Sequence, residues 1–349
     1  MRVAFVTVGD TGRLTGGHLY NARVLAALRE RGIEVEEVVP CGASPGEQEA
    51  AADRLGSLLD PGAFDVVVVD ALARIVCAPH LERWRGERPL VAMIHELPSV
   101  ATPGDTPSWE HEELLLRSDR LISVSLHGAS ILENRGIPAG RICVIPPGSD
   151  RLPNGEETEP HVRDDTVRAL CVAQWIPRKG ILDLVRAWKL RERPGAVLEL
   201  VGETGADPGY ADSVRAAAAA SPDASITVRG PVEDAALGAA YAAADLFVLP
   251  SRYEGYGIVY AEALAHGLPI IACEVGPVPE LVGEGAALLV PLEDVEAISG
   301  ALDLLLDDAD LRNRMSAAAR RRAETLPRWD DTAAGFLGVL RELTAERPP

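Results

Sequence analysis

The chain has 349 residues, about twice the size of a common domain, which favours two domains. With 47% hydrophobic and 25% charged residues, the composition is typical of a protein that buries sizeable cores, and it excludes disorder, collagen and disulfide-stapled mini-proteins. Its 34 basic and 53 acidic residues give a net charge of −19. Because a field of that sign repels nucleic-acid phosphates and anionic lipids, we expect no nucleic-acid partner and no stable membrane association.

The five cysteines lie far apart and form no C-x-x-C pair, which indicates neither a disulfide framework nor a zinc knuckle. We expect reduced thiols in a cytoplasmic protein. The apolar run at residues 3–8 is too short for a signal peptide, and no stretch reaches the roughly 20 apolar residues of a membrane span. The seven histidines show no metal-ligand spacing, so we expect no bound metal.

Short apolar runs alternate with helical patterns along the whole chain. Continuous apolar runs are typical of strands buried on both faces of a parallel sheet, so the pattern predicts an α/β protein. The strands predicted in the first half are residues 2–8, 33–39, 64–69, 90–94, 120–124 and 141–145. The first helix is predicted at residues 18–31, with Gly32 at its carboxyl end.

Residues 149–165 are rich in Pro, Asn, Gly and acidic side chains and have the composition of a linker. The alternation then restarts, with strands predicted at residues 167–172, 197–201, 226–229, 246–249, 269–272 and 287–290. We therefore expect an amino-terminal domain at residues 1–155, a second at 156–325, and a final segment at 326–349 that carries an amphipathic helix. Two doubly wound sheets predict a ligand cleft that faces the carboxyl ends of their strands.

Two features of the first half can bind a ligand. The first strand-to-helix turn, residues 9–18, is glycine-rich, and amides at a helix start suit an anion or an oxygen-rich group. Glycines that only permit a tight turn explain it equally well, and G-x-G-x-x-G is absent. His95 ends an apolar strand, where its imidazole can donate to a substrate or move a proton, although a packed histidine also fits that position.

In the second half, Arg178 and Lys179 stand at a strand-to-helix turn, where the helix dipole disfavours cations unless an anion is bound. The most specific stretch is residues 250–263, with Glu254 in a turn and Glu262 two helical turns further on. Glu254 can accept from sugar hydroxyls, Glu262 can bind a vicinal diol such as ribose, and the amides between them can receive a diphosphate. A D-x-D pair at Asp308 falls in a helical pattern, and we interpret it as a solvated helix end.

Together these residues resemble the retaining glycosyltransferases of family GT4, which have the GT-B fold of two Rossmann-like doubly wound domains with an interdomain cleft. The resemblance runs from Gly16 to about Arg320, through segments such as GGHLYNARVLAALRERGIEV, VAMIHELPS, PRKGILDLVRAW and YAAADLFVLPSRYEGYGIVYAEALA. The spacing of Glu254 and Glu262 matches the E-x7-E motif of that family.

The resemblance implies three catalytic residues. Lys179 would neutralise the donor diphosphate, Glu254 would bind the donor sugar, and His95 would lie beside donor sugar and acceptor. It further implies a ribose ligand in Glu262 and a terminal helix that crosses back to the first domain, with a partner-binding helix as the alternative. The other donor-binding residues expected are Gly16, Gly17, Gln174, Arg178, Gly202, Arg229, Val232, Gly257, Ile258 and Val259.

The sequence departs from the GT4 pattern at two places. Ala173-Gln174 stands where the family usually has Gly-Arg, so one phosphate-facing cation is missing. An amide donates without charge assistance, and we hypothesise that Arg178 substitutes. The loop from Gly276 to Glu280 also differs from the family pattern, which leaves the donor sugar open.

We therefore expect a cytoplasmic hexosyltransferase-type enzyme that moves a sugar from a UDP- or GDP-linked donor to a small soluble acceptor. The resemblance implies retention of configuration, with the leaving diphosphate taking the acceptor proton, and neither a metal nor a further cofactor. A GT-B sugar-nucleotide epimerase and a non-catalytic sugar-nucleotide-binding protein are the alternatives. The sequence leaves a homodimer open.

Overall fold

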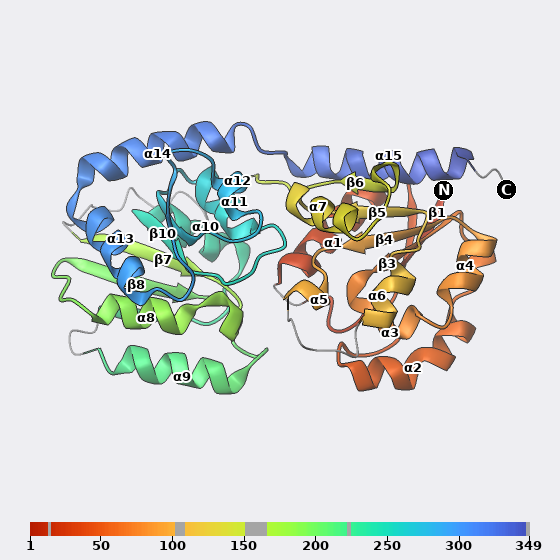
Figure 1. Ribbon diagram of the computed structural model, residues 1–349, viewed down its shortest axis with the longest axis horizontal. Coiled ribbons are helices and arrows are strands. Elements are labelled where there is room, and N and C mark those ends of the chain that lie inside the picture. Colours follow the sequence, from red (N-terminus) through yellow and green to blue (C-terminus); the bar gives the residue numbers. More distant parts are fainter. Residues whose placement is uncertain (13–14, 102–108, 151–165, 222–224, 347–349) are drawn as a thin grey trace. The chain divides into compact units, whose positions relative to one another are not determined.

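A computed structural model describes residues 1–12, 15–101, 109–150, 166–221 and 225–346 (Figure 1). The chain divides into two compact units, Met1–Gly148 with Pro327–Pro349, and Ser149–Leu326. Most of the predicted linker, and Arg13 and Leu14 of the glycine-rich turn, lie outside the described residues.

The first unit contains a parallel sheet of six strands in the order β2-β1-β3-β4-β5-β6. All six begin and end within two residues of the predicted bounds, and β1, β3 and β4 are buried almost throughout, as expected of strands inside a parallel sheet. The strands are β1 (Arg2–Val6), β2 (Glu34–Val38), β3 (Val66–Asp70), β4 (Leu90–Ile94), β5 (Arg120–Ser123) and β6 (Ile142–Val144).

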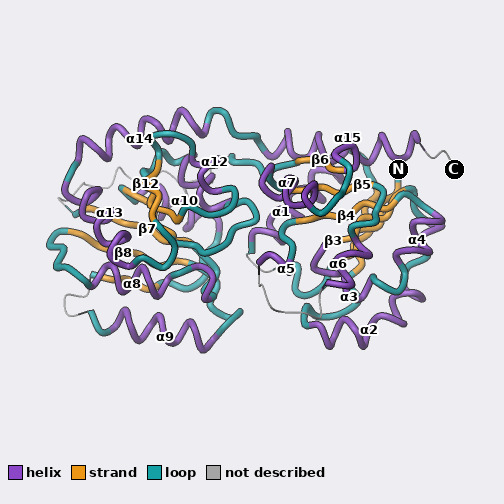
Figure 2. Tube along the Cα trace, viewed as in Figure 1, coloured by secondary structure: helices purple, strands orange, loops and turns teal. Residues whose placement is uncertain are grey.

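Helices cover this sheet on both sides, as Figure 2 shows in purple against the orange strands. The first helix ends before Gly32, whose φ of +78° is the left-handed conformation that favours glycine after a helix. The helices are α1 (Gly16–Glu30), α2 (Pro45–Leu58), α3 (Arg74–Cys77), α4 (Leu81–Glu87), α5 (Pro98–Ala101), α6 (Trp109–Leu115) and α7 (Leu126–Asn134).

The terminal helix α15 (Trp329–Glu346) packs beside α1 in the first unit. Thr332 Oγ1 donates to the carbonyl oxygen of Pro146 at 2.8 Å, and Arg120 pairs with Glu346 at 2.9 Å. Phe336 and Leu340 are buried, as expected for an amphipathic helix. The end of the chain is therefore part of the first unit's fold.

The second unit repeats the architecture with the strand order β12-β11-β10-β7-β8-β9, again all parallel. The strands are β7 (Val167–Val172), β8 (Ala196–Val201), β9 (Ile226–Val228), β10 (Leu246–Leu249), β11 (Ile270–Cys273) and β12 (Ala287–Val290). The helices are α8 (Ile181–Lys189), α9 (Pro208–Ala219), α10 (Asp234–Ala243), α11 (Ile258–Ala265), α12 (Val278–Val282), α13 (Val295–Asp307) and α14 (Ala309–Ala323).

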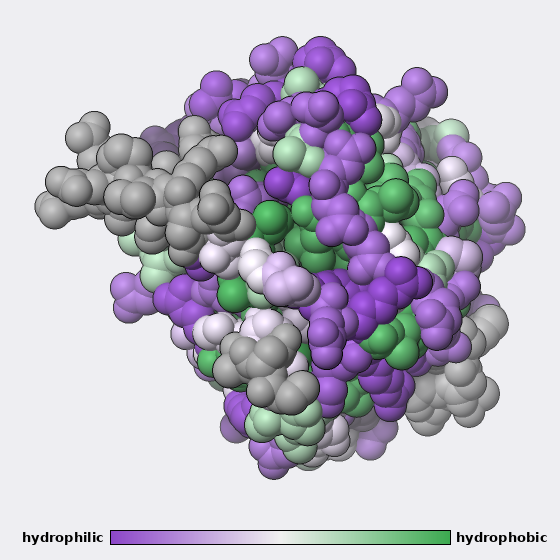
Figure 3. Space-filling view, turned by 90° about the vertical axis from the view of Figure 1, so that its left-hand side faces the viewer, coloured by the Kyte–Doolittle hydropathy of each residue, from purple (hydrophilic) through white to green (hydrophobic). Residues whose placement is uncertain are grey.

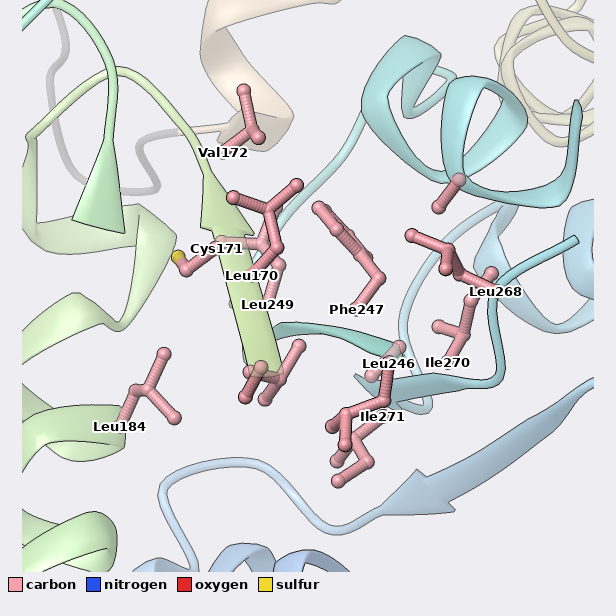
Figure 4. Close-up of a cluster of buried hydrophobic side chains, with 14 of the residues drawn as sticks. Leu170, Cys171, Val172, Leu184, Leu246, Phe247, Leu249, Leu268, Ile270 and Ile271 are labelled. Atoms are coloured by element: carbon pink, nitrogen blue, oxygen red, sulfur yellow. The ribbon is translucent and has the colours of Figure 1, made fainter. Parts of the chain in front are cut away.

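The core of the second unit lies between its sheet and the helices. Figure 4 shows β7 side chains such as Leu170 beside Phe247 of β10 and Ile270 of β11, with Leu184 of α8 nearby. Figure 3 shows one face of the molecule, on which hydrophobic areas lie between hydrophilic ones. Asp308 caps α14 by accepting from Leu311 N at 2.8 Å and is exposed, which confirms the D-x-D pair as a helix end.

Each sheet has one point where the direction of its strand order reverses, and open α/β sheets bind ligands outside the carboxyl ends of the strands at such points. In the first unit the reversal falls between β1 and β3, and in the second it falls between β7 and β10. We therefore expect ligand-binding side chains at these two reversals.

Candidate functional site

The loops that follow β7 and β10 are joined at the reversal of the second sheet. Gly180 has a φ of +67°, and a Cβ there would lie 2.2 Å from the carbonyl oxygen of Pro250, so only glycine allows this approach. The amide of Arg252 donates to the carbonyl oxygen of Arg178 at 2.7 Å. These contacts fix the segment that carries Lys179 against the segment that carries Glu254.

Lys179 and Glu254 form an ion pair across this junction. Nζ lies 2.7 Å from Oε1, and only 12% of the lysine and 6% of the glutamate side chain is exposed. The sequence contains only two lysines, Lys179 and Lys189. Two of the three predicted catalytic residues, 75 positions apart, therefore meet at the expected ligand-binding point, where the carboxylate neutralises the ammonium.

Helix α11 begins shortly after Glu254 in the sequence, and the three predicted phosphate-binding amides lie at its start. Gly257 precedes its first residue with a φ of +100°, and a Cβ there would lie 2.7 Å from the ring of Tyr260. Gly257 has no side chain with which to cap this helix end, and within the described part of the chain no side-chain cap is found there. The amides of Gly257, Ile258 and Val259 thus stand at an uncapped amino terminus, which has the geometry and dipole of an anion site.

Glu262, the predicted ribose ligand, lies on α11 and is only 6% exposed. Its Oε2 accepts a hydrogen bond from the hydroxyl of Tyr241 at 2.9 Å, and Tyr241 comes from α10. Burial, reinforced by the charge of Glu262, raises the pKa of Tyr241 well above its usual value, so the phenol stays a donor. Tyr241 was missed by the sequence interpretation, because it occupies a position of an apolar helix face.

Gln174 and Arg178, the residues around the missing cation, both have protein partners. Gln174 Nε2 donates to Glu203 Oε2 at 3.1 Å, and the guanidinium of Arg178 donates to the carbonyl oxygen of Tyr253 at 3.3 Å. Arg178 also lies over the Tyr253 ring, 5.9 Å from its centroid. The structure thus places Arg178 against the loop that carries Glu254.

Three of the predicted donor-binding residues, Gly202, Arg229 and Val232, lie after β8 and β9. Gly202 has a φ of +141°, and a Cβ there would lie 1.8 Å from the carbonyl oxygen of Ala173, so the chain passes the end of β7 at backbone contact. Arg229 is exposed and pairs with Glu199 at 2.6 Å, while Val232 is half-buried. The loops after β7, β8 and β9 therefore lie along one edge of the sheet.

In the first unit, His95 follows β4 and contacts the start of α1. A Cβ on Gly17 would lie 3.4 Å from His95 Cδ2, so the predicted glycine and the predicted histidine are direct neighbours. Thr15 caps the helix by accepting from the amide of His18 at 3.4 Å, and Gly16 is exposed at its first position. The glycine-rich turn and the imidazole therefore belong to one site.

A buried polar network lies behind His95. Its Nε2 is 2.9 Å from Asn21 Oδ1, and Asn21 Nδ2 donates to Asp70 Oδ2 at 2.6 Å. Asp70 is fully buried and also accepts from the hydroxyl of Thr7 at 3.1 Å and the amide of Leu72 at 2.9 Å. The sequence interpretation missed Asp70, although a polar residue directly after four valines gives the same signal that identified His95.

Burial lowers the pKa of His95 below its usual value, with Asp70 and Glu96 opposing the shift and His18 adding to it. The imidazole is therefore neutral at pH 7. Among the residues that the structure describes, no group of His, Cys, Asp and Glu could hold a metal ion. No described helix is long and apolar enough to cross a membrane.

Comparison with known families identifies the class of protein to which the chain is similar. Residues 156–322 match the family described as Glycosyl transferases group 1, and residues 14–151 match Glycosyltransferase Family 4. The chain belongs to the glycosyltransferases that these two family models describe. It is accordingly an enzyme of the hexosyltransferase class, as its motifs predict.

Curated relatives of this glycosyltransferase are named for sugar transfer. A "D-inositol 3-phosphate glycosyltransferase" of Kineococcus radiotolerans is 28% identical, covering 97% of this chain and 92% of the relative. A "GDP-mannose-dependent alpha-(1-6)-phosphatidylinositol monomannoside mannosyltransferase" of Mycobacterium tuberculosis is 33% identical, covering 60% of this chain and 58% of the relative.

Solved structures establish the GT-B fold of the glycosyltransferase. Sucrose-phosphate synthase from Thermosynechococcus elongatus superimposes with a TM-score of 0.83 at 22% identity, covering 99% of this chain and all of that one. The Anabaena protein HepE in complex with UDP and glucose has a TM-score of 0.81 at 19% identity, covering 98% of this chain and all of that one. The predicted fold class is confirmed.

Proposed function

We propose that this glycosyltransferase moves a sugar from a UDP- or GDP-linked donor to a hydroxyl of a small soluble acceptor, with retention of anomeric configuration and without a metal. The second unit would bind the donor and the first the acceptor. Lys179, Glu254 and His95 would be the catalytic residues. The composition and the dispersed cysteines support a cytoplasmic location, and the sequence leaves a homodimer open.

The observation that carries this proposal is the buried Lys179–Glu254 pair beside the uncapped start of α11. A diphosphate bound at these amides would draw the ammonium toward its own charge, which releases the carboxylate to accept from sugar hydroxyls. One exchange of partners would thereby prepare both the leaving group and the sugar. The Tyr241–Glu262 contact supports ribose binding, since the phenol holds the carboxylate in place at α11.

In the proposed reaction the bond between the anomeric carbon and the diphosphate oxygen breaks, and the acceptor oxygen attacks from the same face. The acceptor proton passes to the departing diphosphate oxygen. Lys179 and the α11 amides would stabilise the charge that develops on the diphosphate, in the way that preorganised donors lower a barrier. No covalent sugar–enzyme intermediate and no metal ion are needed for this balance.

The relatives suggest which acceptor to test first. Several are named for D-inositol 3-phosphate, a small phosphorylated polyol, and others for phosphatidylinositol mannosides. The chain has a net charge of −19, which makes an anionic lipid surface the less favourable partner. We therefore propose a soluble polyol phosphate or a similar hydroxyl compound as the acceptor. The names of both kinds of relative include an inositol compound.

The test is product analysis with the purified protein, UDP- and GDP-linked hexoses and D-inositol 3-phosphate. We expect nucleoside diphosphate and glycosylated acceptor to appear together, and Glu254→Ala to abolish both. Glu324→Ala, an exposed carboxylate in the same unit, is the matched control and should retain transfer. Wild-type turnover in Glu254→Ala would overturn the proposal, and sugar isomerisation without an acceptor would establish the epimerase alternative.

A further inference from the structure

We propose that Asp70 and Asn21 are positioning residues that fix the tautomer of His95, so that its Nδ1 presents a lone pair to a substrate hydroxyl. The inference rests on the proposed function only for the use to which His95 is put. Its structural part, the direction of each hydrogen bond, follows from the first unit alone. Neither residue carries a motif of its own in the sequence.

The direction of the network starts at Asp70, because an ionised carboxylate can only accept. Its two oxygens receive three donors, the side chains of Asn21 and Thr7 and the backbone amide of Leu72. If the amide of Asn21 were turned over, two oxygens would face each other at 2.6 Å. The nitrogen of Asn21 therefore points to Asp70, and its oxygen points to His95.

The position of the Asn21 oxygen determines which nitrogen of the His95 imidazole carries the hydrogen. Since Nε2 of His95 lies 2.9 Å from the oxygen of Asn21, that ring nitrogen carries the hydrogen. In a neutral imidazole the other nitrogen, Nδ1, then holds the lone pair. Among the described residues no hydrogen-bond partner of Nδ1 is found, and 13% of the His95 side chain is exposed.

Packing holds the ring in this orientation. The edge of Tyr20 meets the imidazole with centroids 5.3 Å apart, and Gly17 lies against its Cδ2 atom. The network also sits at the strand reversal, since Asp70 ends β3 and Thr7 follows β1. A fixed ring at the ligand-binding edge of the sheet is the arrangement expected of a group that meets substrate.

Burial keeps His95 neutral, and the carboxylate of Asp70 opposes this effect on its pKa. Burial disfavours the imidazolium, and His18 opposes it further, whereas Asp70 and Glu96 favour it. Oδ2 of Asp70 lies 3.9 Å from Nε2 of His95. Replacing its charge should therefore lower the pKa of His95 further and shift the acid limb of activity to lower pH.

The direct test is the nitrogen NMR spectrum of the full-length protein labelled with ¹⁵N-histidine, at pH 7.5 and without substrate. The signals of His95 are assigned by their loss in His95→Gln. We expect the Nε2–H tautomer in the wild type. In Asp70→Asn the new amide can donate to Asn21 and turn it over, which moves the hydrogen of His95 to Nδ1.

An Nδ1–H tautomer or a charged ring in the wild type would overturn the inference, as would an unchanged spectrum in a folded Asp70→Asn. The wild-type spectrum decides the tautomer even if Asp70→Asn does not fold. Because no substrate is present, a wrong assignment of the reaction cannot produce either result. The positioning inference and the proposed function therefore fail separately.

The kcat and the pH profile distinguish a positioning role of Asp70 from a purely structural one. Asp70→Asn should lower kcat about 10-fold, the size of one lost hydrogen bond to the substrate hydroxyl, and leave the KM for donor within a few-fold. Its acid limb should lie at lower pH than that of the wild type. Thr7→Val, which removes a different hydrogen bond of the same carboxylate, should lower the melting temperature and leave the limb in place. An equal limb in Asp70→Asn and the wild type contradicts the proposal.

Discussion

The ion pair between Lys179 and Glu254 makes a strong prediction for the protein without ligand. Its side chains are 12% and 6% exposed, so removal of one partner leaves the other charge buried and unpaired. Breaking a buried pair in this way costs about 3 to 5 kcal/mol. For a unit of this size each kcal/mol moves the melting temperature by about 2 to 4 °C, so Lys179→Met and Glu254→Gln should each melt about 6 to 20 °C lower.

Scanning calorimetry of the full chain, followed through the transition of the second unit, measures this difference. Arg314→Met is the control, because it removes an exposed pair with Asp308 whose contribution is at most about 1 kcal/mol. If Lys179→Met and Glu254→Gln melt as little below the wild type as Arg314→Met, the pair is not buried as described.

The same two variants should respond differently to nucleotide. A nucleoside diphosphate at about 100 times its dissociation constant adds roughly 2.7 kcal/mol to the stability of the wild type. Lys179→Met should lose this stabilisation, since an unpaired carboxylate then faces the diphosphate. Glu254→Gln should retain or increase it, because Lys179 is released for the phosphates. Equal loss of the nucleotide effect in both variants would refute the exchange of partners.

Three further predictions test other parts of the site. Tyr241→Phe removes the donor that holds Glu262, so calorimetric titration should show about 2- to 12-fold weaker binding of UDP or GDP; equal weakening for 2′,3′-dideoxy nucleotides would contradict the ribose assignment. Gly202→Ala places a Cβ 1.8 Å from a backbone oxygen and should prevent the second unit from folding, whereas Gly230→Ala, with nothing within 4 Å, should melt like the wild type; equal circular dichroism melts would contradict the close approach. Because burial lowers the pKa of His95 below 6.5, the unfolded chain binds more protons below that pH, and stability falls as the pH drops toward the folded pKa. His95→Gln should therefore lose less melting temperature between pH 7.5 and 5.0 than the wild type, and an equal loss would contradict the buried neutral ring.

Local patterns in the sequence predict the strands and the loops that carry chemistry. The twelve strands of the described residues lie at the positions predicted from the sequence. His95 directly follows one of them, and Lys179 and Glu254 lie in turns that come after two others. This works because the carboxyl ends of parallel strands share one edge of the sheet. The order of the strands within each sheet has no such local signal.

The side-chain contacts among the site residues depend on the order of the strands, so they could not be predicted from the sequence. Lys179 and Glu254 are 75 positions apart, and their contact depends on β7 and β10 being neighbours. Tyr241 occupies an apolar helix face, so its hydrogen bond to Glu262 has no periodicity that would distinguish it from packing. Contacts between side chains far apart in sequence require the sheet order, which periodicity alone does not provide.

The most direct test of the central claim is mass spectrometry of the reaction of the purified enzyme with UDP- and GDP-linked hexoses, with and without D-inositol 3-phosphate. The account predicts a glycosylated acceptor and a matching amount of nucleoside diphosphate with one of the two donors, dependent on acceptor and absent in Glu254→Ala. Persistence of that product in Glu254→Ala, or consumption of the sugar nucleotide at equal rate without any acceptor, would contradict it.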